Sequence, residues 1–227
     1  MGTLINVATI LGGSLLGLLI RSRLPDRYVE VIFQALGLFT VFLGVKLGLE
    51  TQQMLVLIPS LVLGALVGEW LRLEDRLQQL GEWLRRRIAS RRHSDHRFAQ
   101  GLVTAFLLFG IGPMSTLGAL QEGLGQGSEV LLTKALLDGI ASVALAAGLG
   151  LGVAFSALPV ALYQGGLTLF AVALQPLITE AAIAELSAVG GIILIGLGLN
   201  LLKLAQLRVS NLLPGLLLAV ILALVMN

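Results

Sequence analysis

Three polar side chains, spaced four residues apart, stand out in an otherwise apolar part of the sequence. Lys134, Asp138 and Ser142 occur in the segment LLTKALLDGIAS, and this spacing places them on one face of a helix. Asp138 lies about eight residues into that segment, which at about 1.5 Å per residue is roughly 12 Å. An ionisable group at that depth in a membrane is costly, and it usually faces the bundle interior and marks an ion or substrate path. The alternative is a purely structural ion pair between Lys134 and Asp138.

A second group of candidates surrounds a proline within a long apolar segment. The sequence FGIGPMSTLGALQ places Gly110, Gly112 and Pro113 together, and proline removes a backbone donor and clashes with the preceding turn. A break there leaves backbone groups that hydrocarbon cannot satisfy, and discontinuous helices of this kind often line solute or ion sites. The alternative is an ordinary kink whose backbone groups bond to Ser115 or Thr116. The binding candidates of this segment are Gly112, Pro113, Ser115 and Gln121.

Further hydrogen-bonding groups occur in the segment PVALYQGGLTL. Tyr163, Gln164 and Thr168 offer hydrogen bonds beside Gly165 and Gly166, which permit close backbone approach. Polar residues of this kind can instead simply join helices. Three more polar residues lie within or at the ends of apolar segments: Asn6, Glu69 and Asn200. Of these, Asn200 is a further binding candidate.

The sequence lacks the motifs of several enzyme classes. It contains no GxxxxGK loop, GxSxG elbow or HExxH pair, which excludes the common routes to ATP hydrolysis, serine hydrolysis and zinc proteolysis. No cysteine is present, so a disulfide, a thiolate nucleophile and a sulfur metal site are excluded. His93, Asp95 and His96 lie in a basic connection that is better explained as a solvated loop than as a metal site. We therefore expect no enzyme activity, no cofactor and no metal centre.

The elements that hold these residues are predicted to cross a membrane. Apolar residues make up 56% of the 227 residues and charged residues only 12%, whereas a soluble domain usually carries about a quarter charged residues. Several apolar stretches reach about 18 residues, enough to cross a hydrocarbon core of about 30 Å, and they are continuous rather than alternating, which excludes strands. We predict an all-α polytopic transmembrane helical bundle of about eight spans, discontinuous in span four: residues 3–20, 29–49, 54–71, 98–120, 130–157, 159–178, 186–204 and 209–226.

The charged residues between these spans indicate how the chain is oriented. Nearly all basic residues fall in alternate connections: Arg21, Arg23, Arg27, eight arginines between residues 72 and 97, Lys203 and Arg208. The opposite connections carry Glu50, Glu122, Glu129, Glu180 and Glu185. Since basic connections remain on the cytoplasmic side, we expect a multi-pass protein of the bacterial cytoplasmic (inner) membrane with both termini outside. The formal net charge of +2 then reflects orientation and does not indicate a nucleic acid partner.

One polar connection divides the predicted spans. Leucines and an isoleucine recur at helical spacing among its arginines and glutamines, which predicts a basic amphipathic cytoplasmic helix within residues 72–97. This helix either contacts anionic lipid headgroups or simply links two bundles. The predicted organisation is a three-span bundle (1–71), this helix (72–97) and a five-span bundle (98–227), joined in one membrane domain.

A faint internal repeat relates spans one to three to spans six to eight. The segment 34–50 has Gly37 and Gly44 seven residues apart, the segment 187–204 has Gly191 and Gly198 at the same spacing, and a proline follows each, Pro59 and Pro214. In the predicted topology the two copies run in opposite directions, as in many secondary transporters; the alternative is a likeness of composition alone. Small residues four apart elsewhere predict packing faces, within the bundle or in a homo-oligomer: Gly13 with Gly17, Gly64 with Gly68, and Gly148 with Gly152.

Five ordered motifs give the sequence a resemblance to a known family. They are GTLIN (2–6), GPMSTLGALQEGL (112–124), KALLDGIAS (134–142), SALPVALYQGGLTL (156–169) and GLGLN (196–200). The set resembles a domain-of-unknown-function family, the YqgA/YdfK-type bacterial inner-membrane proteins, over essentially the whole chain. The resemblance implies a multi-pass bacterial membrane protein and a transporter of unnamed substrate; it carries over no functional residues.

These observations favour a secondary transporter or facilitator of a small polar solute or ion, with a site between spans four, five and six. Two alternatives stay open: an ion or solute channel, and a non-transporting assembly or lipid-binding protein. The expected partners are membrane lipids, the transported solute or ion, and a second copy of the chain.

The predicted topology can be tested with single introduced cysteines, because the chain has none of its own. With an impermeant thiol reagent on intact cells, Ser128→Cys should be labelled and Ser90→Cys should not. The opposite labelling pattern would overturn the orientation.

Overall fold

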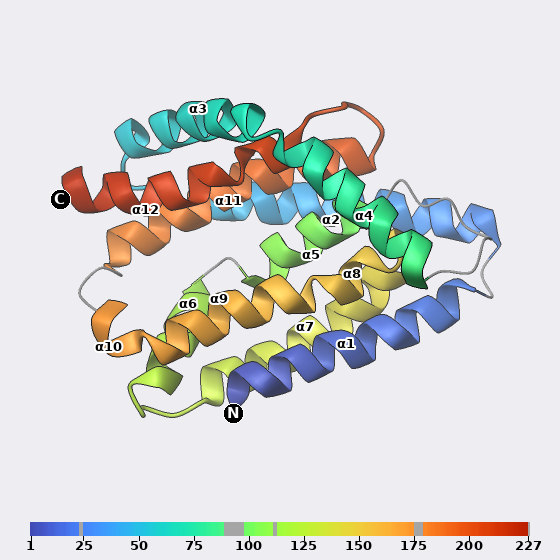
Figure 1. The fold of residues 1–227 in the computed structure, drawn as a ribbon, viewed down its shortest axis with the longest axis horizontal. Helices are drawn as coiled ribbons and strands as arrows, with labels where there is room; N and C mark the ends of the chain where they lie inside the picture. Colours follow the sequence, from blue (N-terminus) through green and yellow to red (C-terminus); the bar gives the residue numbers. More distant parts are fainter. Residues whose placement is uncertain (23–24, 89–97, 111–112, 175–178, 227) are drawn as a thin grey trace.

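The computed structural model describes residues 1–22, 25–88, 98–110, 113–174 and 179–226, and every regular element in these ranges is a helix (Figure 1). Within them, six helices are long and apolar enough to cross a membrane, or up to eight if each of two bent helix pairs counts as one span. The predicted all-helical fold is confirmed.

The chain passes back and forth along the long axis of the molecule (Figure 1). The first four are α1 (Gly2–Arg21), α2 (Asp26–Gly48), α3 (Met54–Trp70) and α4 (Leu73–Ile88). The next six are α5 (Phe98–Gly110), α6 (Pro113–Gly123), α7 (Glu129–Leu149), α8 (Gly152–Phe155), α9 (Ala157–Leu169) and α10 (Ala171–Leu174). The last are α11 (Glu180–Leu201), the short 3₁₀ helix η1 (Val209–Leu212) and α12 (Pro214–Met226). The N-terminal end of α1 and the C-terminal end of α12 both point to the left of this view.

The discontinuity predicted at Pro113 is present. Helix α5 ends at Gly110, α6 begins at Pro113, and the two axes differ by 60°. A proline at the first position of a helix loses no intrahelical bond, so Pro113 starts α6 instead of kinking a continuous span. Residues 111–112, and with them the candidate Gly112, lie outside the described residues.

The predicted boundary between spans five and six is wrong. Span five was expected to reach residue 157, but α7 ends at Leu149 and the next span runs through α8 and α9, from Gly152 to Leu169. The chain turns at Gly150, whose φ of +81° is readily adopted by glycine. The proline taken as the start of span six, Pro159, instead lies in the first turn of α9, where proline is tolerated.

The predicted start of span seven is also wrong. Helix α11 begins at Glu180, six residues before the predicted residue 186, and the Thr179 hydroxyl accepts a hydrogen bond from the Ala182 N–H at 3.1 Å. This cap fixes the helix start. Glu185, which was assigned to an outer connection, is therefore a helical residue and is fully buried.

Helices α2 and α11 cross in opposite directions with their backbones in contact. The glycines meet in reversed order, so that Gly37 lies against Gly198 and Gly44 against Gly191. In the predicted repeat Gly37 corresponds to Gly191, and Gly44 to Gly198. Gly37 thus contacts the counterpart of Gly44, and Gly44 contacts the counterpart of Gly37. A two-fold axis produces reciprocal contacts of this kind. The packing therefore fits an inverted repeat.

Acidic residues of the same two helices lie at similar but not equivalent positions. Glu30 precedes Gly37 by seven residues and Glu185 precedes Gly191 by six. Glu30 of α2 accepts from Lys203, just after α11, at 3.3 Å. Glu185 of α11 in turn accepts from Gln52 and Gln53, just after α2. Each helix thus reaches the turn that follows the other.

The other predicted glycine faces also serve packing within the chain. Gly13 and Gly17 of α1 lie against α7, and Gly64 and Gly68 of α3 lie against α12 and η1. As a result α1, α2 and α3 each pack mainly on a helix from the second half of the chain. The three-span and five-span segments are interleaved, and their division at residues 72–97 stays a prediction.

The predicted amphipathic helix corresponds to α4, which bends by 53° from α3. Its Leu77 packs against the core, whereas Arg72 and Arg76 are exposed. The Glu74 N–H donates to Asn211 Oδ1 at 2.8 Å, and the Ser210 N–H donates to Glu74 Oε2 at 3.1 Å. These reciprocal caps attach the start of α4 to η1.

Replacing Gly44 with alanine tests the packing of α2 on α11. A Cβ atom at residue 44 would lie 2.6 Å from the Gly191 carbonyl oxygen and 2.7 Å from the Ile195 nitrogen. Backbone atoms cannot turn aside as a side chain can, so we expect Gly44→Ala to destabilise the purified protein by about 1–3 kcal/mol. The measurement is the thermal unfolding midpoint.

Gly12→Ala is the matched control for this variant, since a Cβ atom there meets nothing within 4 Å in the described part of the chain. Alanine is favoured over glycine inside a helix by about 0.5–1 kcal/mol, so this variant should unfold no earlier than the natural protein. An equal loss of stability in both variants would contradict the close packing.

Candidate functional site

The helical face that carries Lys134 and Asp138 is turned into the bundle. Both side chains belong to α7 and are only 6% exposed. The Lys134 ammonium donates directly to Asp138 Oδ2. The pair is thus buried and charge-balanced, as a membrane span requires.

A chain of amides and hydroxyls extends from this pair across the bundle. The Asn6 side chain of α1 interacts with the Asp138 carboxylate, and its Nδ2 donates to Gln164 Oε1 of α9 at 3.1 Å. Gln164 Nε2 then donates to Ser115 Oγ of α6 at 2.9 Å. Asn6, Gln164 and Ser115 are fully buried. The polar chain therefore joins α7, α1, α9 and α6, and it ends in the first turn after the helix break.

One atom of this polar chain is unpaired. Asn6 Oδ1 is buried and has no hydrogen-bond partner among the described residues. A buried acceptor left without a partner costs about 1–3 kcal/mol, which marks it as a group able to bind something further.

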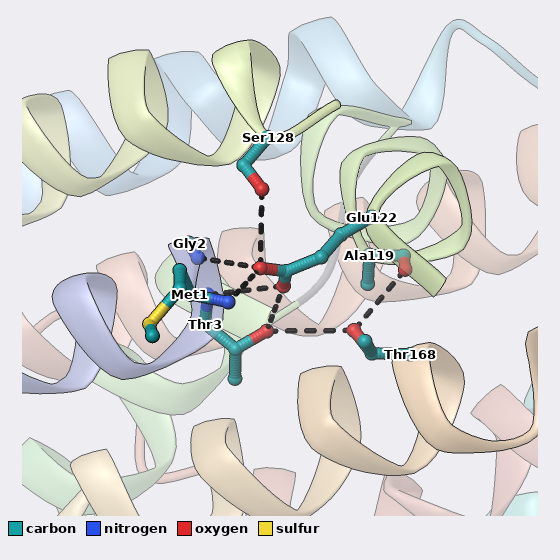
Figure 2. Close-up of polar contacts among 7 residues, drawn as sticks. All are labelled: Met1, Gly2, Thr3, Ala119, Glu122, Ser128 and Thr168. Carbon is teal, nitrogen blue, oxygen red and sulfur yellow. Dashed lines mark hydrogen bonds and ion pairs between the residues drawn. The ribbon is translucent and has the colours of Figure 1, made fainter. Parts of the chain in front are cut away.

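Glu122 lies beside the start of α1 (Figure 2). Its carboxylate accepts from the Met1 ammonium, from the Thr3 N–H at 3.2 Å, and from the Thr3 hydroxyl at 2.9 Å. It also accepts from the Gly2 N–H at 2.5 Å and from the Ser128 hydroxyl at 3.2 Å. A carboxylate is favoured at the positive end of a helix, so Glu122 of α6 holds the first turn of α1.

Two further contacts attach α9 to this cluster. The Thr168 hydroxyl donates to the Ala119 carbonyl of α6 at 3.1 Å and lies 3.5 Å from the Thr3 hydroxyl. The Tyr163 and Thr116 hydroxyls share a hydrogen bond of 2.9 Å. The second half of the broken helix pair is therefore bonded to α1 at its end and to α9 along its length.

The structure brings most of the sequence-predicted candidates together. Lys134, Asp138, Gln164 and Ser115 lie in the polar chain, and Tyr163 and Thr168 lie beside it on α9. Pro113 begins α6, and Gln121 lies half-buried near the end of that helix.

Two candidates lie apart from the polar chain. Ser142 donates to the Gly139 carbonyl of its own helix at 2.8 Å and packs against Gly13 of α1. Asn200 holds the turn after α11, where it donates to the Leu207 carbonyl at 2.7 Å and accepts from the Leu207 N–H at 2.8 Å. The close backbone approach expected at Gly165 and Gly166 is not present among the described residues, since a Cβ atom at either meets nothing within 4 Å.

Sequence reasoning missed the roles of Asn6, Glu122 and Glu185. An amide near the start of an apolar span was a usable signal for Asn6. The two glutamates gave none, because each lies more than a hundred residues from the backbone groups it binds. The fully buried Glu185 accepts from the Thr51 hydroxyl at 2.9 Å and from the Gln52 and Gln53 N–H groups at 2.7 and 2.8 Å, and so caps the start of α3.

These apolar helices around a buried polar chain fit a multi-pass helical membrane protein. The chain belongs to the family described as "Protein of unknown function (DUF554)", whose model matches residues 1–224, which confirms the resemblance expected from the motifs. It is 34% identical over 220 residues to the "Uncharacterized membrane protein YdfK" of Bacillus subtilis (strain 168), covering 95% of this chain and 92% of that protein. It is 30% identical over 221 residues to the "Uncharacterized protein YqgA" of Escherichia coli (strain K12), covering 96% and 94%. No solved structure matches the chain.

The variant Glu122→Gln tests the role of this carboxylate. The side chain keeps its size, but one acceptor oxygen becomes an NH₂ group that faces the donors at the start of α1. Loss of a charged acceptor of this kind costs about 1.5–3 kcal/mol, and the thermal unfolding midpoint of the purified protein should fall by several degrees.

Glu129→Gln provides the matched control, because Glu129 is an exposed glutamate in the first turn of α7. It loses only a solvated charge near a helix start, which is worth about 0.3–1 kcal/mol. If the two variants lost the same stability, Glu122 would have no special role in holding α1.

Proposed function

We propose that this protein is a secondary transporter of a small polar solute or ion across the bacterial cytoplasmic membrane. The observation that supports this most is the buried polar chain that runs from Asp138 through Asn6 and Gln164 to Ser115. Such groups are costly inside a membrane domain and are usually retained where a polar cargo passes. Packing alone would not require α1, α9 and α6 to be joined by side-chain hydrogen bonds in succession.

The chemistry of the polar chain indicates the kind of cargo. The ammonium of Lys134 and the carboxylate of Asp138 cancel each other's charge, so the site as a whole is neutral. The remaining groups are the Asn6 and Gln164 amides and the Ser115 hydroxyl, which exchange hydrogen bonds readily. A small polar solute that replaces these internal bonds with its own can bind without leaving a buried group unpaired.

The helix break gives this site a means of opening. Helix α6 carries Ser115 in its first turn and Glu122 in its last, and it meets α5 at an angle of 60°. A short helix freed at one end can tilt about the break while the glycine-packed pair of α2 and α11 stays fixed. Tilting would separate Glu122 from α1 at the outer end and expose the polar chain there, as alternating access requires.

The exposed basic residues support the proposed orientation. Arg72, Arg76, Lys203 and Arg208 are exposed, and they lie in or near the connections that follow α3 and α11. Basic residues of this kind remain in the cytoplasm. Both termini and Glu122 then face the outside.

A thermal-shift screen of the purified protein against amino acids, sugars, organic acids and inorganic ions tests the proposal. A true ligand stabilises the folded state, by about 2.7 kcal/mol at a hundred times its dissociation constant. We expect at least one compound to raise the unfolding midpoint and to be taken up saturably by proteoliposomes that contain the protein. Uptake that rises linearly with concentration would indicate a channel instead.

Two variants with the same substitution distinguish the site from the rest of the core. Ser115→Ala should abolish both the thermal shift and the uptake. Ser187→Ala should retain them, because Ser187 is an equally buried serine of α11 outside the polar chain. A compound whose effect survives Ser115→Ala, or a screen without any stabilising compound, would contradict transport through this site.

A further inference from the structure

The bend between α3 and α4 exposes aromatic and basic side chains together. We propose that this corner of the protein binds the headgroup of an anionic membrane lipid, through Trp70 at the end of α3 and through Arg72 and Arg76, which follow it. The inference does not depend on transport, because it concerns a surface outside the buried polar chain.

The bend separates an apolar helix from a charged one. Helix α3 ends at Trp70, and α4 leaves it from Leu73 at an angle of 53° (Figure 1). Charged residues occur along α4 from its first turn to its last, whereas its Leu77 packs against the core. A helix with one apolar side and one charged side lies along a membrane surface and keeps its charges among the headgroups.

The two tryptophans of the sequence indicate the depth of this corner in the membrane. Trp70 is 82% exposed on one side of the bend, and Trp83 is 51% exposed on the other. Tryptophan concentrates at the level of the headgroups, where its ring meets the acyl chains and its N–H meets polar groups. The exposed side of the bend therefore lies where lipid phosphates are available.

The arginines at the bend have no acidic partner within the protein. Arg72 and Arg76 are exposed, and neither guanidinium forms a hydrogen bond or an ion pair in the described ranges of the chain. The carboxylates of Glu69 and Glu74 bond instead to the segment around η1. Two free guanidinium groups four residues apart suit a lipid phosphate, which accepts paired hydrogen bonds from arginine.

The backbone of Arg72 also supports a role for its side chain. Its φ of +50° is the left-handed conformation that follows many helices and that glycine adopts most easily. Lys203 after α11 has the same conformation, with φ of +59°, but its ammonium bonds to Glu30 at 3.3 Å. A cationic side chain at a position that favours glycine indicates a use for the charge, and for Arg72 the lipid supplies the anion.

Tryptophan fluorescence reports on this site directly, because both tryptophans flank it. The full-length protein is placed in phosphatidylcholine vesicles at constant ionic strength, with an equal fraction of either brominated phosphatidylglycerol or brominated phosphatidylcholine. Bromine quenches a tryptophan that it contacts. We expect the anionic lipid to quench more strongly, with a relative binding constant at least about fivefold higher, since each arginine at a membrane surface contributes about that factor.

Three variants test the residues of the site. Arg76→Gln should lower the preference for phosphatidylglycerol about fivefold. Lys46→Gln is the matched control and should retain the preference, because it removes one exposed positive charge from α2, outside the corner. Arg72→Gly should also lower the preference, yet in detergent without lipid it should unfold no earlier than the natural protein, because glycine adopts a positive φ freely.

Equal quenching by the two brominated lipids would overturn the proposal. An equal loss of preference in Arg76→Gln and Lys46→Gln would overturn it too, because the attraction would then come from net charge alone. Inorganic phosphate at the same ionic strength should leave the quenching unchanged, and reversal by phosphate would show that the arginines hold a free anion instead of a lipid. If Arg76→Gln does not fold, the lipid preference of Arg72→Gly decides the matter, and an unchanged preference there excludes the site.

Discussion

Hydrocarbon offers no hydrogen bonds, and this constraint decides where the polar groups of the chain lie. Every amide, hydroxyl and charge inside the bundle must find its partner within the protein or bind something else. Glu185 and Glu122 meet this requirement for the starts of α3 and α1, where backbone N–H groups would otherwise have no acceptor. Asn6 Nδ2, Gln164 and Ser115 pair with one another in the same way, whereas Asn6 Oδ1 has no partner among the described residues. The position of α6 relative to α1 and α9 follows from these bonds.

The same solvent leaves little hydrophobic force between helices, so close backbone contact must hold the remaining ones together. The contacts of Gly37 and Gly44 with α11, and of Gly13 and Gly17 with α7, provide it. In the two-fold arrangement of α2 and α11, the same glycine-to-glycine contact occurs at two places. In the proposed transporter, the polar, hydrogen-bonded helices α6 and α9 would move against this close-packed pair.

The sequence was sufficient to predict the helices, the break at Pro113 and the packing role of the glycine pairs, because each is a local signal of composition or spacing. The buried Lys134 and Asp138 pair was predictable for the same reason, since both residues lie on one helix. The predicted helix boundaries were wrong where one residue was compatible with two local structures. Pro159 was taken as a helix start although Gly150 makes the turn, and Glu185 was taken as a loop residue although Thr179 caps the helix before it. The cluster around Glu122 was beyond sequence reasoning, because its partners Gly2 and Thr3 are adjacent only after α1, α6 and α7 have packed.

Asn6 lies between the Glu122 contacts at the start of α1 and the Lys134–Asp138 ion pair of α7. It lies on the helix whose first turn Glu122 holds, its carboxamide interacts with the ion pair of α7, and its Nδ2 begins the chain that ends at the helix break. A shift of α1 at Glu122 would therefore move Asn6 relative to Asp138, and a change at Asp138 would be felt by Gln164 and Ser115. Asn6 has two polar atoms, and only its nitrogen is paired by the described chain.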